Sequence, residues 1–120
     1  MRRLEPSEKQ IQTSFFEWLK FKTDVRSYAF AIPNGGYRNK FEAYNLSKSG
    51  VSSGAPDLFI AIPNNILNYH GLFIEMKTKN GRLSNAQKVW IDRLNGNGYL
   101  AKVCYSLDEA IETVNYYIEG

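Results

Sequence analysis

The segment 71–79, GLFIEMKTK, constrains the fold most strongly, because an apolar run typical of a buried strand leads directly into charged residues. Side chains on a strand alternate between its two faces. Glu75 and Lys77 therefore share one face, whereas Ile74 and Met76 point to the other. The sequence predicts a strand that contributes to the core on one side and holds a carboxylate beside an ammonium group on the other.

A second apolar run, Asp57 to Ile62, precedes this strand and is joined to it by PNNILNYHG, whose Pro, Asn and Gly content indicates a connection. If the two runs pair as an antiparallel hairpin, its centre lies near residue 67. This pairing places Asp57 opposite the neighbourhood of Glu75 to Lys77. Three charged side chains are then expected to converge.

Three capping-box patterns predict the helix starts: Ser7 with Gln10, Ser84 with Gln87, and Ser106 with Glu109. In the first half of the chain we expect a helix over 8–22, a strand over 28–32, and a loop over 37–53 with a short helix near 39–47. The second half is predicted to contain a second long helix, a strand over 99–105 and a C-terminal helix. The apolar stripe of that last helix is Ala110, Ile111, Val114 and Ile118. Residues 1–120 are predicted to form a single α/β domain with a central mixed sheet flanked by helices.

Composition narrows the functional classes. The apolar fraction of 43% argues against disorder, and the apolar runs are too short to span a membrane. The N-terminal residues lack the apolar core of a signal peptide, so we expect a soluble intracellular protein. Cys104 and His70 are the only Cys and His, which argues against a disulfide and against a zinc site built from such ligands. A metal here is expected to have oxygen ligands.

The net charge of +3 is unevenly distributed. Residues 105–120 contain four acidic and no basic side chains, so the first 104 residues, with 15 basic and 8 acidic side chains, have a net charge of +7. A basic surface attracts phosphate backbones, although charge alone does not identify a nucleic-acid-binding protein.

The predicted convergence of Asp57 and Glu75 suggests a metal site. Two neighbouring carboxylates repel each other, and a cation between them offsets that repulsion. With oxygen ligands, the expected ion is Mg²⁺, with Mn²⁺ as a substitute. Lys77 is then placed to hold an attacking water or to stabilise charge on a phosphate.

These residues resemble the PD-(D/E)xK nuclease signature of restriction-endonuclease-like proteins, since Pro56-Asp57 is followed 18 residues later by Glu75-Met76-Lys77. The chain is also similar to the VRR-NUC branch, the virus-type replication-repair nucleases. The stretches that carry this similarity are Gly54-Ala55-Pro56-Asp57-Leu58, Glu75-Met76-Lys77-Thr78, Gly81-Arg82-Leu83-Ser84, Gln87 and Gly98-Tyr99. It extends from about Glu8 to Tyr117.

The resemblance implies roles for individual residues. Asp57 and Glu75 correspond to the metal ligands, and the backbone carbonyl of Met76 to a third. Lys77 corresponds to the catalytic lysine. Glu8 matches the glutamate of the N-terminal helix, which reaches the metal through water, and Gln87 matches a glutamine of the catalytic site. Basic residues near the predicted site are the candidates for contacts with DNA: Arg38, Lys40, Lys48, Lys79 and Arg82.

Stand-alone members of this family imply a homodimeric, Mg²⁺-dependent endonuclease that cuts branched DNA such as four-way (Holliday) junctions, with a bacterial or phage-infected host cytoplasm as its location. No small-molecule cofactor and no membrane are expected. A flap nuclease or exonuclease with the same metal site remains an alternative, as does a non-catalytic DNA-binding module that retains the fold. We identify no base-reading motif, so recognition is expected to depend on DNA shape and backbone.

Each candidate residue also has an ordinary explanation. Glu75 and Lys77 could form an ion pair at a solvated strand end, and Asp57 could be a turn residue after a proline. Glu8 could simply interact favourably with the dipole at the start of its helix, and Gln87 could simply complete its capping box. His70 is expected at the surface and Cys104 in the core.

Overall fold

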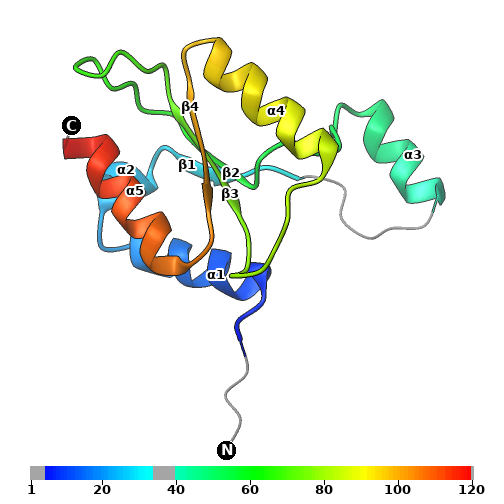
Figure 1. The fold of residues 1–120 in the computed structure, drawn as a ribbon, viewed down its shortest axis with the longest axis horizontal. Helices are drawn as coiled ribbons and strands as arrows, with labels where there is room; N and C mark the ends of the chain where they lie inside the picture. The colour runs from blue at the N-terminus through cyan, green and yellow to red at the C-terminus, as the bar shows by residue number, and fades with distance from the viewer. Residues whose placement is uncertain (1–4, 34–39, 120) are drawn as a thin grey trace, which may run out of the picture.

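The fold is described by a computed structural model that covers residues 5–33 and 40–119. Within them lie α1 (Glu8–Leu19), α2 (Thr23–Arg26), β1 (Ala29–Ala31), α3 (Lys40–Lys48), β2 (Leu58–Ile60), β3 (Leu72–Met76), α4 (Asn85–Gly96), β4 (Leu100–Cys104) and α5 (Leu107–Glu119) (Figure 1). The predicted α/β class is confirmed. The short helix α2 was not predicted, and α1 ends at Leu19, three residues earlier than expected.

The described strands form one mixed sheet in the order β1-β2-β3-β4. The β1–β2 and β2–β3 pairs are antiparallel, and β4 is parallel to β3 after a crossover through α4. In the β2–β3 hairpin Leu58 pairs with Ile74, so Asp57, one residue before β2, lies at the position opposite Glu75. The register expected from the sequence is confirmed.

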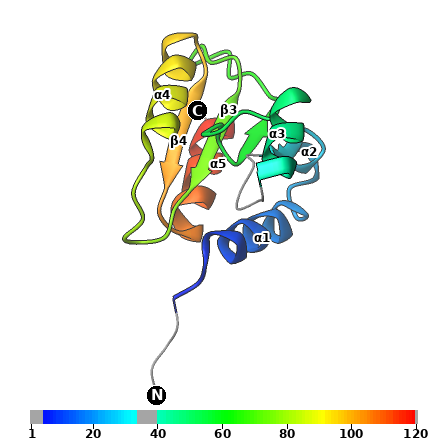
Figure 2. The same cartoon turned by 90° about the vertical axis from the view of Figure 1, so that its right-hand side faces the viewer.

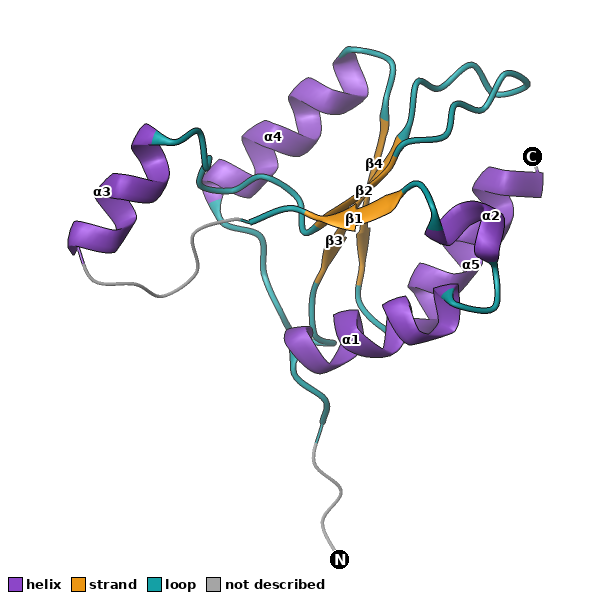
Figure 3. Ribbon diagram, turned by 180° about the vertical axis from the view of Figure 1, so that it is seen from behind, coloured by secondary structure: helices purple, strands orange, loops and turns teal. Residues whose placement is uncertain are grey.

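Helices cover the two faces of the sheet unequally. Helices α1 and α5 pack against one face and against each other, while α4 lies across β4 on the other side (Figures 1 and 2). Seen from behind in Figure 3, α3 lies at the periphery, away from the packed layers. One face of the sheet is therefore enclosed, and the other is covered mainly at its β4 side.

The core lies between the sheet and the pair α1 and α5. Leu58, Ile60, Leu72, Ile74 and Met76 supply its sheet side and are fully buried. The helices contribute Phe15, Leu19, Ala110, Val114 and Tyr117, among others. Cys104 is buried as predicted, whereas Ile118 of the predicted α5 stripe is 43% exposed and Tyr117 occupies the core instead. The Tyr117 hydroxyl remains satisfied there because it donates a hydrogen bond of 2.7 Å to the Ile62 carbonyl.

Two of the three predicted capping boxes form completely. In α1 and in α4, the serine hydroxyl accepts from the glutamine N–H and the glutamine side chain accepts from the serine N–H. At α5 the Ser106 hydroxyl accepts from the Glu109 N–H, but the Glu109 carboxylate accepts from the Tyr105 N–H instead. Each bond satisfies a backbone N–H that has no partner within its helix.

The outer edge of β4 is occupied by side chains from neighbouring helices. The Asn95 amide accepts from the Ala101 N–H at 2.9 Å and donates to the Ala101 carbonyl at 3.3 Å. The bond from the Tyr105 N–H to Glu109 lies just beyond the strand. At the opposite edge of the sheet, Arg26 donates to the Ala29 carbonyl of β1 at 3.0 Å.

None of the helices in the described residues is long and apolar enough to cross a membrane.

Candidate active site

Asp57 is held in place at the end of the β2–β3 hairpin. Its carboxylate accepts a hydrogen bond of 2.7 Å from the Met76 N–H, and its carbonyl accepts one of 2.8 Å from the Ile32 N–H. Gly54 shapes the preceding turn, with a φ of 86°, and a Cβ there would lie 2.6 Å from the Ala86 backbone. The turn therefore requires glycine to bring Asp57 and the start of α4 together.

Glu75 extends from β3 toward α4 and is only 2% exposed. Its Oε2 atom accepts a hydrogen bond of 3.0 Å from Nε2 of Gln87. Among the described residues, its Oε1 atom has no hydrogen-bond partner. A buried carboxylate oxygen without a partner is energetically costly, and such an atom in a native fold calls for an explanation such as a bound ion or water.

Lys77 lies between two glutamates. Its Nζ atom is 3.9 Å from Oε2 of Glu75 and 4.0 Å from Oε1 of Glu8. The Lys77 side chain is 9% exposed and that of Glu8 is 47% exposed. Gly81 packs against the lysine stem, since a Cβ there would lie 3.3 Å from Cδ of Lys77. The ammonium is thus held near the carboxylates in a partly enclosed position.

The electrostatics reflect this crowding. Burial, and after it the negative charge of Asp57, raises the pKa of the Glu75 carboxyl to about 8. Burial also raises the pKa of Asp57, opposed mainly by the hydrogen bond from the Met76 N–H. Without a further positive charge, ionising both carboxyl groups is unfavourable, even with Lys77 nearby.

The donor chemistry fits an oxygen-preferring divalent cation. Asp57 and the Oε1 atom of Glu75, once ionised, would supply hard, negatively charged ligands of the kind that Mg²⁺ and Mn²⁺ prefer. No group of three or more His, Cys, Asp or Glu side chains capable of holding a metal is found in residues 5–33 and 40–119. Water and backbone oxygen would therefore complete the coordination, which is common for Mg²⁺. The Met76 carbonyl stays a prediction for one of these positions.

The geometry shows that the ordinary explanations are incomplete. Glu75 and Lys77 are buried rather than solvated, and Asp57 bonds across the hairpin rather than serving a turn alone. Gln87 takes part in both its capping box and the candidate site, because its Oε1 accepts from the Ser84 N–H while its Nε2 donates to Glu75. Glu8 starts α1 and also lies beside Lys77. His70 is exposed, as expected.

The Gly54 contact with Ala86 was not identified from the sequence. The glycine could have been singled out there, because it stands directly before the Ala-Pro-Asp turn. Its packing partner is 32 residues further along the chain, beyond the reach of a local pattern.

Comparison with known families decides the assignment. A family model for the VRR-NUC domain matches residues 1–108. The chain belongs to the VRR-NUC family. A solved structure described as a VRR-NUC domain protein is also similar: it is 30% identical, has a TM-score of 0.83, and the match covers 97% of this chain and 91% of that one. A comparison with proteins of curated function returns no match.

Membership confirms the resemblance inferred from Asp57, Glu75 and Lys77. It implies a nuclease of the virus-type replication-repair class, and hence DNA as the substrate. The individual roles of the site residues stay predictions based on the geometry described above.

The basic residues predicted to contact DNA are only partly described. Arg38 and the side chain of Lys40 lie outside the described part of this VRR-NUC domain. Lys79 and Arg82 are exposed in the loop that follows Lys77, close to the site in sequence. Lys48 is exposed on α3, where its ammonium lies 5.4 Å from the centre of the Tyr44 ring.

Proposed function

We propose that this VRR-NUC domain is a Mg²⁺-dependent, structure-specific endonuclease that cuts branched DNA, with the four-way junction as its substrate and a homodimer as its active form. The observation that carries the proposal is the buried Glu75 carboxylate. One of its oxygens has no partner among the described residues, and it lies at the strand position opposite Asp57 with Lys77 beside it.

In this proposal Asp57 and Glu75 would hold the metal, with the Met76 carbonyl as a third ligand and Glu8 acting through water. A Mg²⁺ ion held there would supply the charge that polarises the scissile phosphodiester and lowers the pKa of a water at the site. Every other contribution comes from side-chain and backbone groups that the fold already orients. The Met76 N–H fixes one oxygen of Asp57, and Gln87 fixes Oε2 of Glu75. Oε1 of Glu75 takes part in neither of these hydrogen bonds.

Lys77 supplies the positive charge in this mechanism. Its ammonium, held between Glu8 and Glu75, orients the attacking water or stabilises the negative charge that develops on the phosphate. Removing such a preorganised donor typically lowers the rate by about 10²–10³-fold. Lys77 is therefore the residue whose loss separates catalysis from DNA binding most clearly.

DNA recognition is proposed to depend on the phosphate backbone. Lys79 and Arg82 are exposed next to the site, and Lys48, Arg38 and Lys40 belong to the segment around α3. Contacts of this kind fix the position of a duplex without reading its sequence. Binding should then weaken steeply with salt because counterions are released.

The test is cleavage of end-labelled four-way junction, flap and linear duplex DNA with Mg²⁺ or with EDTA. Wild type is compared with Lys77→Ala, and with Lys102→Ala as a control for loss of an exposed lysine on β4. We expect paired, symmetric, Mg²⁺-dependent cuts near the branch point, lost only in Lys77→Ala. Cleavage of the flap alone would replace the junction proposal with a flap nuclease. Junction binding without cleavage in either Mg²⁺ or Mn²⁺ would replace it with a binding module.

The homodimer has a separate test. A four-way junction requires two cuts, and a two-fold dimer supplies two sites. Size exclusion with light scattering should give twice the mass of 13.8 kDa for the free protein, and the same protein mass in the complex once the mass of the junction DNA is subtracted. A monomer under both conditions would contradict this part of the proposal.

A further inference from the structure

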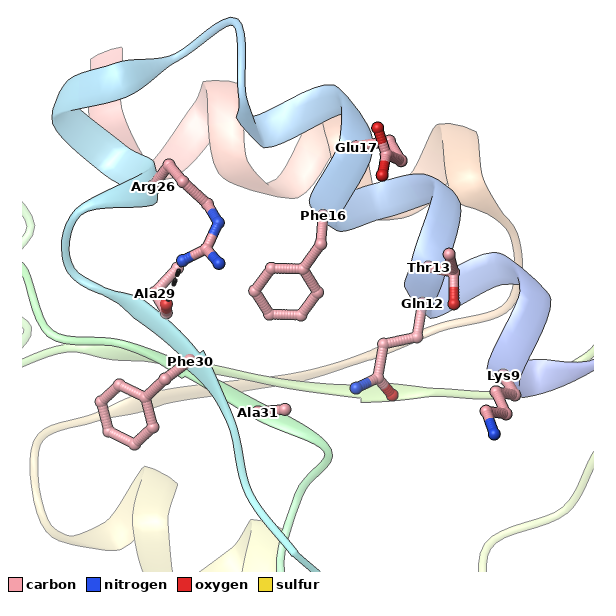
Figure 4. A pocket seen from close by; sticks show the side chains of 9 residues that line it. All are labelled: Lys9, Gln12, Thr13, Phe16, Glu17, Arg26, Ala29, Phe30 and Ala31. Atoms are coloured by element: carbon pink, nitrogen blue, oxygen red, sulfur yellow. Dashed lines mark hydrogen bonds between the residues drawn. The ribbon is translucent and has the colours of Figure 1, made fainter.

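A groove separate from the carboxylates lies between α1 and the outer edge of β1 (Figure 4). It has a volume of about 460 Å³, and Glu8, Asp57, Glu75 and Lys77 are not among the residues that line it. The mechanism proposed above gives this groove no role. Its two ends differ in chemistry, and the difference indicates what the groove can bind.

The end near α2 is formed by an aromatic ring and a guanidinium group that already contact each other. In Figure 4, Phe16 points from α1 into the groove, and the Arg26 guanidinium lies 5.2 Å from the centre of the Phe16 ring. Arg26 also donates to the Ala29 carbonyl at 3.0 Å. Contacts within the protein therefore hold Arg26 in place, and its positive charge attracts anions to the groove.

The other end of the groove lies next to the active site. Lys9 directly follows Glu8 on α1, and Ala31 on the β1 wall pairs with the residue that follows Asp57. Gln12 is four residues beyond Glu8, which is about 6 Å along the helix axis. A DNA strand advances by about 3.4 Å per nucleotide along its duplex. A strand that follows α1 away from the scissile phosphate therefore brings a phosphate to this end of the groove within one or two nucleotides.

Three donors at this end have no hydrogen-bond or ion-pair partner among residues 5–33 and 40–119: the Lys9 ammonium, the Gln12 side-chain amide and the Ala31 backbone N–H. In Figure 4, Gln12 extends from α1 toward β1. The Ile32 N–H donates to the Asp57 carbonyl on the β2 side. Because backbone groups alternate in direction along a strand, the Ala31 N–H points away from β2, toward the open edge.

The local charges favour an anion. The two glutamates of α1 each have a lysine beside them, since Glu8 lies 4.0 Å from Lys77 and Glu17 pairs with Lys20 at 3.0 Å. Lys9 has no such carboxylate among the described residues. Lysine ammonium groups, glutamine amides and backbone N–H groups are the donors that proteins commonly direct at DNA phosphates. Hydrogen bonds of this kind are strengthened by the charge of the phosphate.

We infer that Lys9, Gln12 and the Ala31 N–H bind a DNA phosphate one or two nucleotides from the scissile phosphate on the same strand. The contact involves only the sugar-phosphate backbone, so the strand stays base-paired within an arm of the four-way junction. It fixes the register of that strand over Asp57 and Glu75. This inference rests on the proposed function and names the part of the DNA substrate that the groove holds.

The test measures binding to four-way junctions in which a single phosphate has lost its charge. A neutral methylphosphonate replaces one phosphate at a time near the branch point, and fluorescence anisotropy gives the affinity. The protein background is Lys77→Ala with Mg²⁺, so that the DNA stays intact. Gln12→Ala and Lys9→Ala are compared with Lys102→Ala, which removes an exposed lysine of β4 outside the groove.

We expect one position at which the neutral linkage weakens binding by the Lys77→Ala protein about 10-fold, the loss expected for a hydrogen bond to a charged group. Gln12→Ala should weaken binding of the unmodified junction by a similar factor. At that position the two losses should not multiply, because they remove the same contact.

Lys9→Ala should show the same coupling at the same position. It should also reduce the slope of log affinity against log salt by about 0.9, the effect of one lost phosphate contact. Lys102→Ala should change neither quantity. Lys9 is exposed, so its variant tests the groove even if Gln12→Ala fails to fold.

Other results would overturn the inference. Losses that multiply at every position in both groove variants would show that the groove contacts no phosphate, and wild-type cleavage in that case would reject the groove alone. Coupled losses without cleavage by wild type would support the groove and reject only the nuclease. Absence of junction binding would reject the proposed junction substrate together with the groove contact.

Discussion

The two faces of β3 differ in what they do for the protein. Leu72, Ile74 and Met76 point into the core and are fully buried in apolar surroundings. One position along the strand, Glu75 is almost as deeply buried but has a raised pKa, an oxygen without a partner among the described residues, and a charged neighbour. The first face stabilises the fold, whereas the second places charges where they cost stability, and the proposed function assigns these charges to the reaction at a phosphate.

The largest expected effect is on the charged face. Asp57→Asn keeps an oxygen that can accept from the Met76 N–H, so the hairpin should remain intact. It removes a negative metal ligand, and cleavage should fall by about 10²–10³-fold, the effect of losing one group that stabilises transition-state charge. Single-turnover rates and circular dichroism measure the two properties, with Asp92→Asn on the exposed surface of α4 as the control. Unchanged cleavage would remove Asp57 from the site.

The opposite result is expected from Ile74→Ala on the core face. Loss of a fully buried isoleucine should lower the free energy of unfolding by about 2–5 kcal/mol because a cavity remains. Urea denaturation measures this change. Cleavage per folded molecule, measured at low temperature, should stay within a few-fold of wild type. A large loss of cleavage in the folded variant would show that the two faces are not independent.

Glu75→Gln sharpens the comparison because activity and stability should move in opposite directions. Cleavage should be lost, while in EDTA the melting temperature should rise by about 3–6 °C, the shift expected for about 1 kcal/mol in a domain of this size. Glutamine keeps the oxygen that accepts from Gln87 and removes the buried charge. Differential scanning fluorimetry measures the shift, with Glu112→Gln on α5 as an exposed control.

The sign of the pH dependence follows from the raised pKa of Glu75. Its carboxyl has the usual glutamate pKa of 4.5 in the unfolded chain and a pKa of about 8 in the folded chain, which therefore holds the proton more tightly. The contribution of this group to stability is present below about pH 4.5 and is lost as the pH rises toward 8. The advantage of Glu75→Gln over wild type should be larger near pH 8 than near pH 5. The reverse trend would contradict the burial argument.

The smallest effect concerns Gln87, whose two hydrogen bonds can be separated. Ser84→Ala and Gln87→Ala should each lower stability by about 1 kcal/mol, because both disrupt the cap of α4. Only Gln87→Ala also removes the bond to Glu75, so it alone should reduce cleavage, by about 10-fold for a hydrogen bond to a charged group. Equal cleavage by the two variants would restrict Gln87 to its capping role.

Much of the fold and the site could be predicted because it depends on local patterns. Alternation in 71–79 and the short connection determined the hairpin, and the hairpin brought Asp57 to Glu75. Serine and glutamine spacing located two helix starts. The sequence did not show which of Tyr117 and Ile118 enters the core, because this depends on how α5 is rotated against the sheet.

The Asn95 amide of α4 occupies backbone groups at the outer edge of β4, which affects how copies of this protein can pair there. A strand that added to this side of the sheet would first have to displace both hydrogen bonds to Ala101. Edge strands without such protection invite pairing with other chains. Asn95 therefore opposes the pairing of this edge with a strand of another molecule at Ala101.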